Sequence, residues 1–165
     1  MSHPILRLAT AEDLPAINAI YNHYVLHSTA TYQTTPETEA ARLAWFHNRN
    51  LAHHPVVVAE QAGRIAAWGS LSPFGKREAF AKTVENSIYV HPDCHRRGLG
   101  RLLLQDQLQR AAAAGHRALI AAISSDQAPS LALHRTLHFA EVGRLLQVGW
   151  KFDQWLDLVY LQRLL

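Results

Sequence analysis

The chain has 165 residues, of which 48% are hydrophobic and 18% are charged, and its formal net charge is +3. This composition predicts one folded domain over residues 1–165 and excludes a long disordered tail or a coiled coil. The net charge is too small for the dense basic face of a nucleic-acid-binding protein, and no apolar run is long enough to span a membrane. Cys94 is the only cysteine, which excludes an internal disulfide and favours a reducing, cytoplasmic location.

The N-terminal third predicts one strand followed by two helices. Residues 5–9 form a short β-branched and apolar strand, and capping residues 10–13 follow it. The next apolar residues have helical spacing and predict a helix that ends near Val25; they are Leu14, Ile17, Tyr21 and Tyr24. After a polar loop, Thr35-Pro36-Glu37 has the pattern of a cap, a first-turn proline and an acid, so we expect the second helix to run from there to about Arg49.

The middle of the chain predicts three strands. Residues 55–59 and 65–71 read as a hairpin around the turn at 61–63. A loop over 72–80 leads to a long strand, Thr83 to Val90, whose residues alternate between two faces. Glu85 lies in the middle of this strand. A buried carboxylate without a partner costs free energy, so Glu85 indicates either a wet cleft or a dedicated role.

The C-terminal part predicts two helices and three strands. A helix begins after Gly100 and ends at Ala114-Gly115, followed by an unbroken apolar strand. The remaining expected elements are that strand at 118–123, a short helix at 131–137 that Pro129 introduces, and strands at 140–146 and 155–163. This order of strands and helices indicates a mixed α/β domain.

The strand that ends at Val90 runs into a basic, glycine-containing loop and then a helix. Such a loop suits an anion, because glycines let the backbone approach closely and the first helical turn leaves free N–H groups. A Walker loop is excluded, since no Gly-x-x-x-x-Gly-Lys-Ser/Thr run exists. A dinucleotide fingerprint is weak because Leu103 occupies the place of its third glycine. Two interpretations of this stretch remain: a tight turn, or a loop that binds a pyrophosphate. The loop consists of His95-Arg96-Arg97-Gly98-Leu99-Gly100.

That loop resembles the Arg/Gln-x-x-Gly-x-Gly/Ala motif of the GCN5-related N-acetyltransferase (GNAT) superfamily, with His95 in place of the usual Arg or Gln. The resemblance implies the superfamily's α/β fold: a mixed, mostly antiparallel sheet of about seven strands, flanked by about four helices. It also implies a splayed pair of parallel strands at the acetyl-CoA site. Acetyl-CoA is then the cosubstrate.

Further runs resemble the branch of this superfamily that acetylates phosphinothricin, methionine sulfone and methionine sulfoximine. They are residues 22–24, 28–29, 83–90, 129–130, 133–134 and 149–152, with Trp155, Asp157 and Gln162. The resemblance implies transfer of an acetyl group to the α-amino group of a small amino acid, and it implies a homodimer. The chain departs from the family pattern at Gln33, Gln127 and His138.

The resemblance also implies the binding residues. Acetyl-CoA would contact the end of the strand, the basic loop and the start of the last helix, through Ile88, Tyr89, Val90, His95, Arg96, Arg97, Gly98, Leu99, Gly100, Arg101, Gln127 and Ser130. Residues from two loops are expected to contact the amino-acid acceptor, with a basic pair suited to its carboxylate: Tyr32, Lys76, Arg77 and Phe80.

Two residues are predicted to act in catalysis. An ammonium group must lose a proton before it attacks a thioester, and the resemblance assigns the base to Glu85. His134 matches a histidine of the phosphinothricin branch, where it could protonate the leaving thiolate, help to deprotonate the amine, or be structural. Cys94 lies inside the phosphate loop and is not expected to be a nucleophile. The histidines lack metal-ligand spacing, so no metal is expected.

Two other functions remain open from the sequence. A peptide or protein N-terminal acetyltransferase would use the same cofactor and would tolerate a blocked carboxyl group. A non-catalytic acetyl-CoA sensor would bind the coenzyme without transferring the acetyl group.

Overall fold

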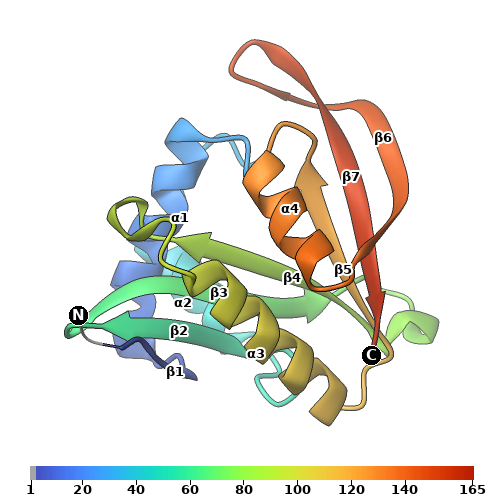
Figure 1. Cartoon of the computed structure of the whole chain (residues 1–165). Helices are drawn as coiled ribbons and strands as arrows, with labels where there is room; N and C mark the ends of the chain where they lie inside the picture. The colour runs from blue at the N-terminus through green and yellow to red at the C-terminus, as the bar shows by residue number, and fades with distance from the viewer. Residues whose placement is uncertain (1–2) are drawn as a thin grey trace.

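A computed structural model describes residues 3–165; residues 1 and 2, which the sequence analysis included in the domain, lie outside the described part. Over this range, seven strands form one sheet in the order β1-β2-β3-β4-β5-β7-β6 (Figure 1). The strands are β1 (Ile5–Leu8), β2 (Val56–Gln61), β3 (Arg64–Pro73), β4 (Thr83–Val90), β5 (Ala118–Ser124), β6 (Ala140–Lys151) and β7 (Gln154–Leu164). The helices are α1 (Leu14–His27), α2 (Glu39–His47), α3 (Leu99–Ala113) and α4 (Ala128–Thr136).

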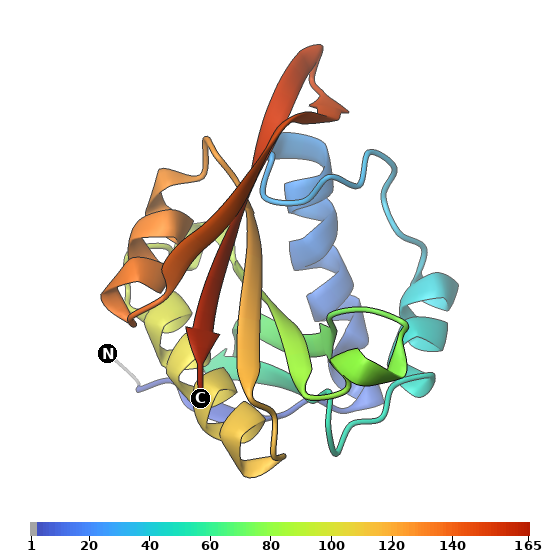
Figure 2. The ribbon, with the colours of Figure 1, turned by 90° about the vertical axis from the view of Figure 1, so that its right-hand side faces the viewer.

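The sheet separates two pairs of helices. Figure 2 shows α1 and α2 on one face and α3 and α4 on the other. The helices bury apolar stripes against the sheet: Ile17 of α1 packs in a cluster with Trp68, and Leu104 of α3 packs in another with Leu119. Burying a large apolar side chain contributes about 1.5–3 kcal/mol, so these two layers hold the sheet in place.

The parallel pair β4–β5 opens along its length. Residues Thr83, Val84 and Glu85 pair with Ala118, Leu119 and Ile120, whereas the ladder does not continue over the rest of β4. The other neighbouring strands pair antiparallel. The predicted mixed sheet with a splayed parallel pair is therefore confirmed.

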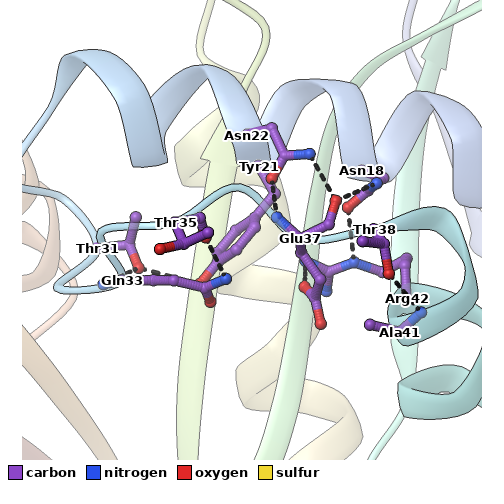
Figure 3. Close-up of polar contacts among 10 residues, drawn as sticks. All are labelled: Asn18, Tyr21, Asn22, Thr31, Gln33, Thr35, Glu37, Thr38, Ala41 and Arg42. Carbon is purple, nitrogen blue, oxygen red and sulfur yellow. Dashed lines mark hydrogen bonds and ion pairs between the residues drawn. The ribbon is translucent and has the colours of Figure 1, made fainter.

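The second helix begins later than the sequence predicted. Its N-cap is Thr38, whose hydroxyl accepts a hydrogen bond from the Ala41 amide, and not Thr35. Asn22 of α1 both donates to the Glu37 carbonyl and accepts from the Glu37 amide, and Asn18 donates to the same carbonyl (Figure 3). These bonds hold the chain extended just before Thr38, which overrides the helix signal of the proline.

The last hairpin is longer than predicted and projects from the rest of the sheet at the top of Figures 1 and 2. Phe152 and Asp153 both have φ in the left-handed region, as the tight turn of a hairpin requires. An irregularity interrupts the ladder between Leu145 and Gly149, where the Gln147 amide donates to the Asp157 carboxylate. The predicted strand over 140–146 ends within this irregularity.

Candidate active site

A cavity of about 830 Å³ lies where β4 and β5 diverge. Its wall is built by β4 and β5, the loop before α3, the start of α4, and the loop between α1 and α2. Most of the residues predicted from the sequence line it: Tyr32, Glu85, Ile88, Tyr89, Val90, His95, Arg96, Gly98, Leu99, Gly100, Arg101, Gln127, Ser130 and His134. The structure therefore brings the predicted coenzyme and catalytic residues to one place.

Four predicted residues do not line this cavity. Arg97 belongs to the basic loop but is absent from the wall. Lys76, Arg77 and Phe80 lie on the exposed β3–β4 loop, which contains a short 3-10 turn over Glu78–Phe80. The Phe80 ring packs edge-on against Phe74, with ring centroids 5.5 Å apart. The structure thus separates this loop from the cavity wall.

The basic loop enters α3 through left-handed backbone. Gly98 is the N-cap of α3 with φ of 80°, a conformation that strains any residue with a side chain, and Arg96 has φ of 60°. Gly100 lies at a close approach, since an added Cβ would be 3.2 Å from Leu133. The first turn of α3 leaves backbone N–H groups without helical partners, and together with Arg96 and Arg101 it forms a basic end of the cavity whose chemistry suits an anion.

His95 ties this loop to α1. Its Nε2 lies 2.8 Å from the Tyr24 hydroxyl and 3.2 Å from the Val90 carbonyl, and the Tyr24 hydroxyl donates to that same carbonyl at 2.6 Å. Sequence reasoning did not assign Tyr24 to the site, although the residue lies in one of the runs that resemble the family. In place of the family's Arg or Gln, this chain therefore uses a His–Tyr pair to anchor the start of the loop.

Glu85 is a half-buried carboxylate on the cavity wall. Among residues 3–165, no side chain or backbone group donates a hydrogen bond to it or forms an ion pair with it. Burial raises the pKa of the Glu85 carboxyl above its ordinary value. An unpaired carboxylate with a raised pKa is suited to accept a proton from a bound ligand.

His134 is buried on the opposite side of β4. Its ring lies between the Ser130 carbonyl of α4 and the side chain of Asn86, and it packs edge-on against Phe139. Burial lowers the pKa of His134, and the hydrogen bond to Ser130 partly offsets this shift. The ring is therefore held neutral near pH 7.

The loop between α1 and α2 forms the remaining wall and was assigned from the sequence only at Tyr32. Thr29 donates to the Asp126 carboxylate and accepts from the Gln127 amide at 2.7 Å, which ties the loop to the start of α4. The Tyr32 hydroxyl donates to the Asp157 carbonyl of β7 at 2.9 Å. Because the partners in these contacts are far apart in the sequence, no local sequence pattern predicts them.

Lys151 of β6 fastens the same loop from the other side. Its buried ammonium donates to the carbonyls of Ser28 and Thr31, both at 2.7 Å. These bonds also satisfy backbone groups just beyond the C-terminus of α1. Burial lowers the pKa of Lys151. The long hairpin thus positions the loop that carries Tyr32.

Gln33, where several members of the resembled branch carry Arg, has its side chain hydrogen-bonded to its own loop and to α1. Its amide donates to the Thr35 carbonyl at 2.7 Å and accepts from the Tyr21 hydroxyl at 2.9 Å (Figure 3). Behind it, Arg42 pairs with Glu37 and stacks on the Tyr21 ring at 4.6 Å. Gln33 consequently braces the loop and does not line the cavity.

Residues 3–165 contain neither a metal-binding cluster nor a membrane-spanning helix. No three or more His, Cys, Asp or Glu side chains converge so that they could hold a metal ion. None of the helices in this range has the length and apolarity needed to cross a bilayer.

Comparison with known proteins agrees with this geometry. The family model described as "Acetyltransferase (GNAT) family" matches residues 17–139. The chain is 43% identical over 158 residues to the L-methionine sulfoximine/L-methionine sulfone acetyltransferase of Pseudomonas aeruginosa, covering 95% of this chain and 92% of that protein.

Two solved structures are also similar. A GNAT superfamily phosphinothricin acetyltransferase from Sinorhizobium meliloti, in complex with acetyl-CoA, superposes with a TM-score of 0.95 at 37% identity, covering 100% of this chain and 89% of that one. The ribosomal-protein-alanine N-acetyltransferase from Brucella melitensis gives a TM-score of 0.95 at 40% identity, covering 98% and 99%. The chain belongs to the GNAT family of acetyltransferases.

Proposed function

We propose that this protein transfers the acetyl group of acetyl-CoA to the α-amino group of a small amino acid or analogue, of the methionine sulfone, methionine sulfoximine or phosphinothricin type. The observation that carries the proposal is the single cavity whose wall includes both the anion-binding end of α3 and the unpaired carboxylate of Glu85. The similarity to the Pseudomonas and Sinorhizobium enzymes supports the same acceptor class.

Glu85 is proposed as the general base. In a ternary complex, the carboxylate takes a proton from the acceptor's ammonium group, directly or through a water. The free amine attacks the thioester carbonyl, so that a C–N bond forms, the C–S bond breaks, and coenzyme A leaves as a thiolate. The proton that the thiolate then requires comes from His134 or from water.

The coenzyme is proposed to bind along the free edge of β4. Beyond Glu85, β4 has no ladder partner on the β5 side, so its backbone groups on that edge are available to the pantetheine amides, as an added strand would use them. The amide of Val90 is the proposed oxyanion donor. The pyrophosphate is assigned to the amides of the α3 N-terminus and to Arg96, Arg97 and Arg101.

Recognition of the acceptor is proposed to use both of the predicted loops. Tyr32 lines the cavity, whereas Lys76, Arg77 and Phe80 lie outside its wall. We assign the acceptor's carboxylate to the basic pair Lys76 and Arg77, for which the family resemblance at Arg77 is the support. Replacing Arg77 by Ala should raise the KM for a free amino acid.

A homodimer and a cytoplasmic location complete the proposal. Large apolar side chains are exposed along the projecting hairpin, namely Val142, Leu145, Leu146, Val148, Trp150, Phe152 and Trp155. Such a concentration of exposed apolar side chains is typical of an interface, and a second copy of the chain is the proposed partner. The single buried cysteine suits a reducing compartment.

Acetylation of a protein or peptide N-terminus is the second candidate. The similarity to the Brucella ribosomal-protein-alanine N-acetyltransferase favours it. A non-catalytic acetyl-CoA sensor is the third candidate, and the unpaired Glu85 carboxylate argues against it.

Release of the coenzyme thiol from acetyl-CoA tests the proposal. The panel contains free amino acids, methionine sulfone, methionine sulfoximine, phosphinothricin and an amino-acid amide. We expect thiol release with one or two of the free amino acids or analogues and no thiol release with the amino-acid amide. Equal release with acid and amide would favour the N-terminal acetyltransferase, and acetyl-CoA binding without any release would favour the sensor.

A further inference from the structure

One nitrogen of His134 has its protonation state fixed by the backbone. Nδ1 lies 2.9 Å from the carbonyl oxygen of Ser130, one turn earlier in α4. A carbonyl oxygen only accepts hydrogen bonds, so Nδ1 carries a proton. In a neutral imidazole, Nε2 is then a lone-pair acceptor.

The other nitrogen is constrained by a separate chain of amides. The Gln107 amide nitrogen, in α3, donates to the Ser70 carbonyl at 3.3 Å and to the Ser87 carbonyl at 3.0 Å. These two carbonyls use both of its hydrogens and leave its oxygen toward Asn86, whose amide nitrogen donates to that oxygen at 3.3 Å. The backbone of β3 and β4 thus determines the orientation of both amides.

The second hydrogen of the Asn86 amide reaches His134. Asn86 Nδ2 lies 3.1 Å from His134 Nε2, and because the amide nitrogen can only donate, Nε2 must accept. A proton on Nε2 would face an N–H group, and turning the Asn86 amide over would place its oxygen against that of Gln107. Two independent constraints therefore select the same neutral tautomer.

Among residues 3–165, no charged group forms a hydrogen bond or an ion pair with this network. Gln107, Asn86 and His134 are only 1%, 7% and 4% exposed. The groups packed on His134 from each side are the Ser130 carbonyl from α4, Asn86 from β4 with Gln107 behind it, and the Phe139 ring. Glu85 and Ser87 flank Asn86 in β4 and alternate to the other face of the strand. Each side-chain N–H group of the network has an acceptor, and these donors fix its geometry; the buried Asn86 Oδ1 has no hydrogen-bond partner among residues 3–165.

The sheet also makes room for the network. Gly69 of β3 lies beside the Gln107 amide, and a Cβ added there would be 2.6 Å from Gln107 Nε2. The absence of a side chain at this position lets the amide reach both backbone carbonyls.

We infer that Asn86 and Gln107 are positioning residues that hold His134 as a neutral imidazole protonated on Nδ1, so that His134 is not the proton donor to the leaving thiolate. This inference rests on the proposed function and deepens it. Of the two sources named for the thiolate's proton, it selects water. His134 then shapes the cavity wall, and Glu85 is the titrating group that the reaction uses.

The nitrogen-15 spectrum of the imidazole rings in the folded full chain tests the inference without any turnover. The His134 signal is assigned by its loss in His134→Gln. The expected result is an Nδ1-protonated ring that stays neutral to a pH below that at which an ordinary histidine titrates. A ring protonated on Nε2, or on both nitrogens at neutral pH, would overturn the inference.

Two variants change the network in different ways. Asn86→Asp replaces the donor by a carboxylate, so we expect His134 to become doubly protonated at neutral pH. Should this variant fail to fold, Gln107→Met frees the Asn86 amide to turn, and we expect the His134 ring to titrate at a higher pH than in the unchanged protein. Gln109→Met, on an exposed position of the same helix, is the matched control and should leave the spectrum as it was. A His134 signal that neither variant moves would contradict the positioning role.

Kinetics give an independent readout. With water as the donor, His134→Gln should lower kcat by less than about 3-fold and keep the shape of the pH–rate profile, whereas loss of a proton donor typically costs about 100-fold or more. Loss of one limb of the profile in His134→Gln would reinstate His134 as the acid. If Glu85→Gln kept full turnover, the proposed function's base would be wrong while the His134 spectrum remained a valid test.

Discussion

The two ends of the cavity are built in different ways. The end that we propose for the coenzyme consists of one continuous stretch, from the end of β4 through the glycine loop into α3, and its groups are mostly backbone amides with left-handed turns at Arg96 and Gly98. The end that we propose for the acceptor is formed by the α1–α2 loop, which side-chain contacts tie to the start of α4 and to the hairpin β6–β7. The first is a local motif, whereas the second depends on the whole fold. Changes at the two ends should therefore alter different kinetic constants.

The largest expected effect lies between the two ends. Glu85→Gln keeps the shape of the side chain and removes the base, so kcat with methionine sulfone should fall about 100-fold or more while acetyl-CoA binding is kept. Steady-state thiol release and calorimetric titration with acetyl-CoA measure the two effects. Glu12→Gln, at an exposed position, is the control. Unchanged turnover in Glu85→Gln would remove Glu85 from the mechanism.

The coenzyme end is tested by a matched pair of glycines. Gly98 and Gly63 both have left-handed φ, and an added Cβ would meet nothing within 4 Å at either position. Replacing either by Ala should cost about 1–2 kcal/mol of stability from backbone strain. Only Gly98→Ala should also raise the KM for acetyl-CoA, by about 10-fold, a loss of about 1.4 kcal/mol in binding. Equal effects of the two variants on this KM would mean that the loop does not bind the coenzyme.

The acceptor end is tested through Lys151. Lys151→Met keeps the apolar stem but leaves the carbonyls of Ser28 and Thr31 without their donor, at a cost of about 1–3 kcal/mol in stability. Because the freed loop carries Tyr32, we expect the KM for the acceptor to rise about 5-fold and that for acetyl-CoA to stay the same. The exposed Lys82→Met is the control. A rise confined to the KM for acetyl-CoA would contradict this positioning role.

The smallest expected effects come from the titration of Glu85. Burial raises the pKa of the Glu85 carboxyl in the folded state, so its protonated form is favoured there. Activity should therefore fall as pH drops through this raised pKa, which lies above the pKa of an ordinary glutamate. The stability that the raised pKa contributes is present at low pH and is lost as pH rises through it. At neutral pH, Glu85→Gln should therefore raise Tm slightly, by less than about 4 °C, measured by thermal unfolding. A lower Tm at pH 7 would show that the carboxylate is stabilised in the fold.

The contrast between a local motif and contacts that are distant in the sequence explains which features the sequence could predict. The order of elements and the glycine loop follow from local patterns, namely the alternation in β4, the positions of Gly98 and Gly100 and the apolar run of β5. The splayed parallel pair was predicted only from the family resemblance. The start of α2 could not be predicted, because Asn18 and Asn22 of α1 override the signal at Pro36. Nor could Tyr24, Thr29 and Lys151 be assigned to the site wall or its support, since their partners are far away in the sequence.

We propose that separable parts of one cavity hold the coenzyme and the acceptor. The most direct test is a two-substrate kinetic analysis of Gly98→Ala, Lys151→Met and the double variant, with acetyl-CoA and methionine sulfone varied together. We expect the first variant to change only the KM for acetyl-CoA and the second only the KM for methionine sulfone, and we expect the double variant to show both changes in full. If both single variants raised the same KM, the two ends of the cavity would not bind coenzyme and acceptor separately.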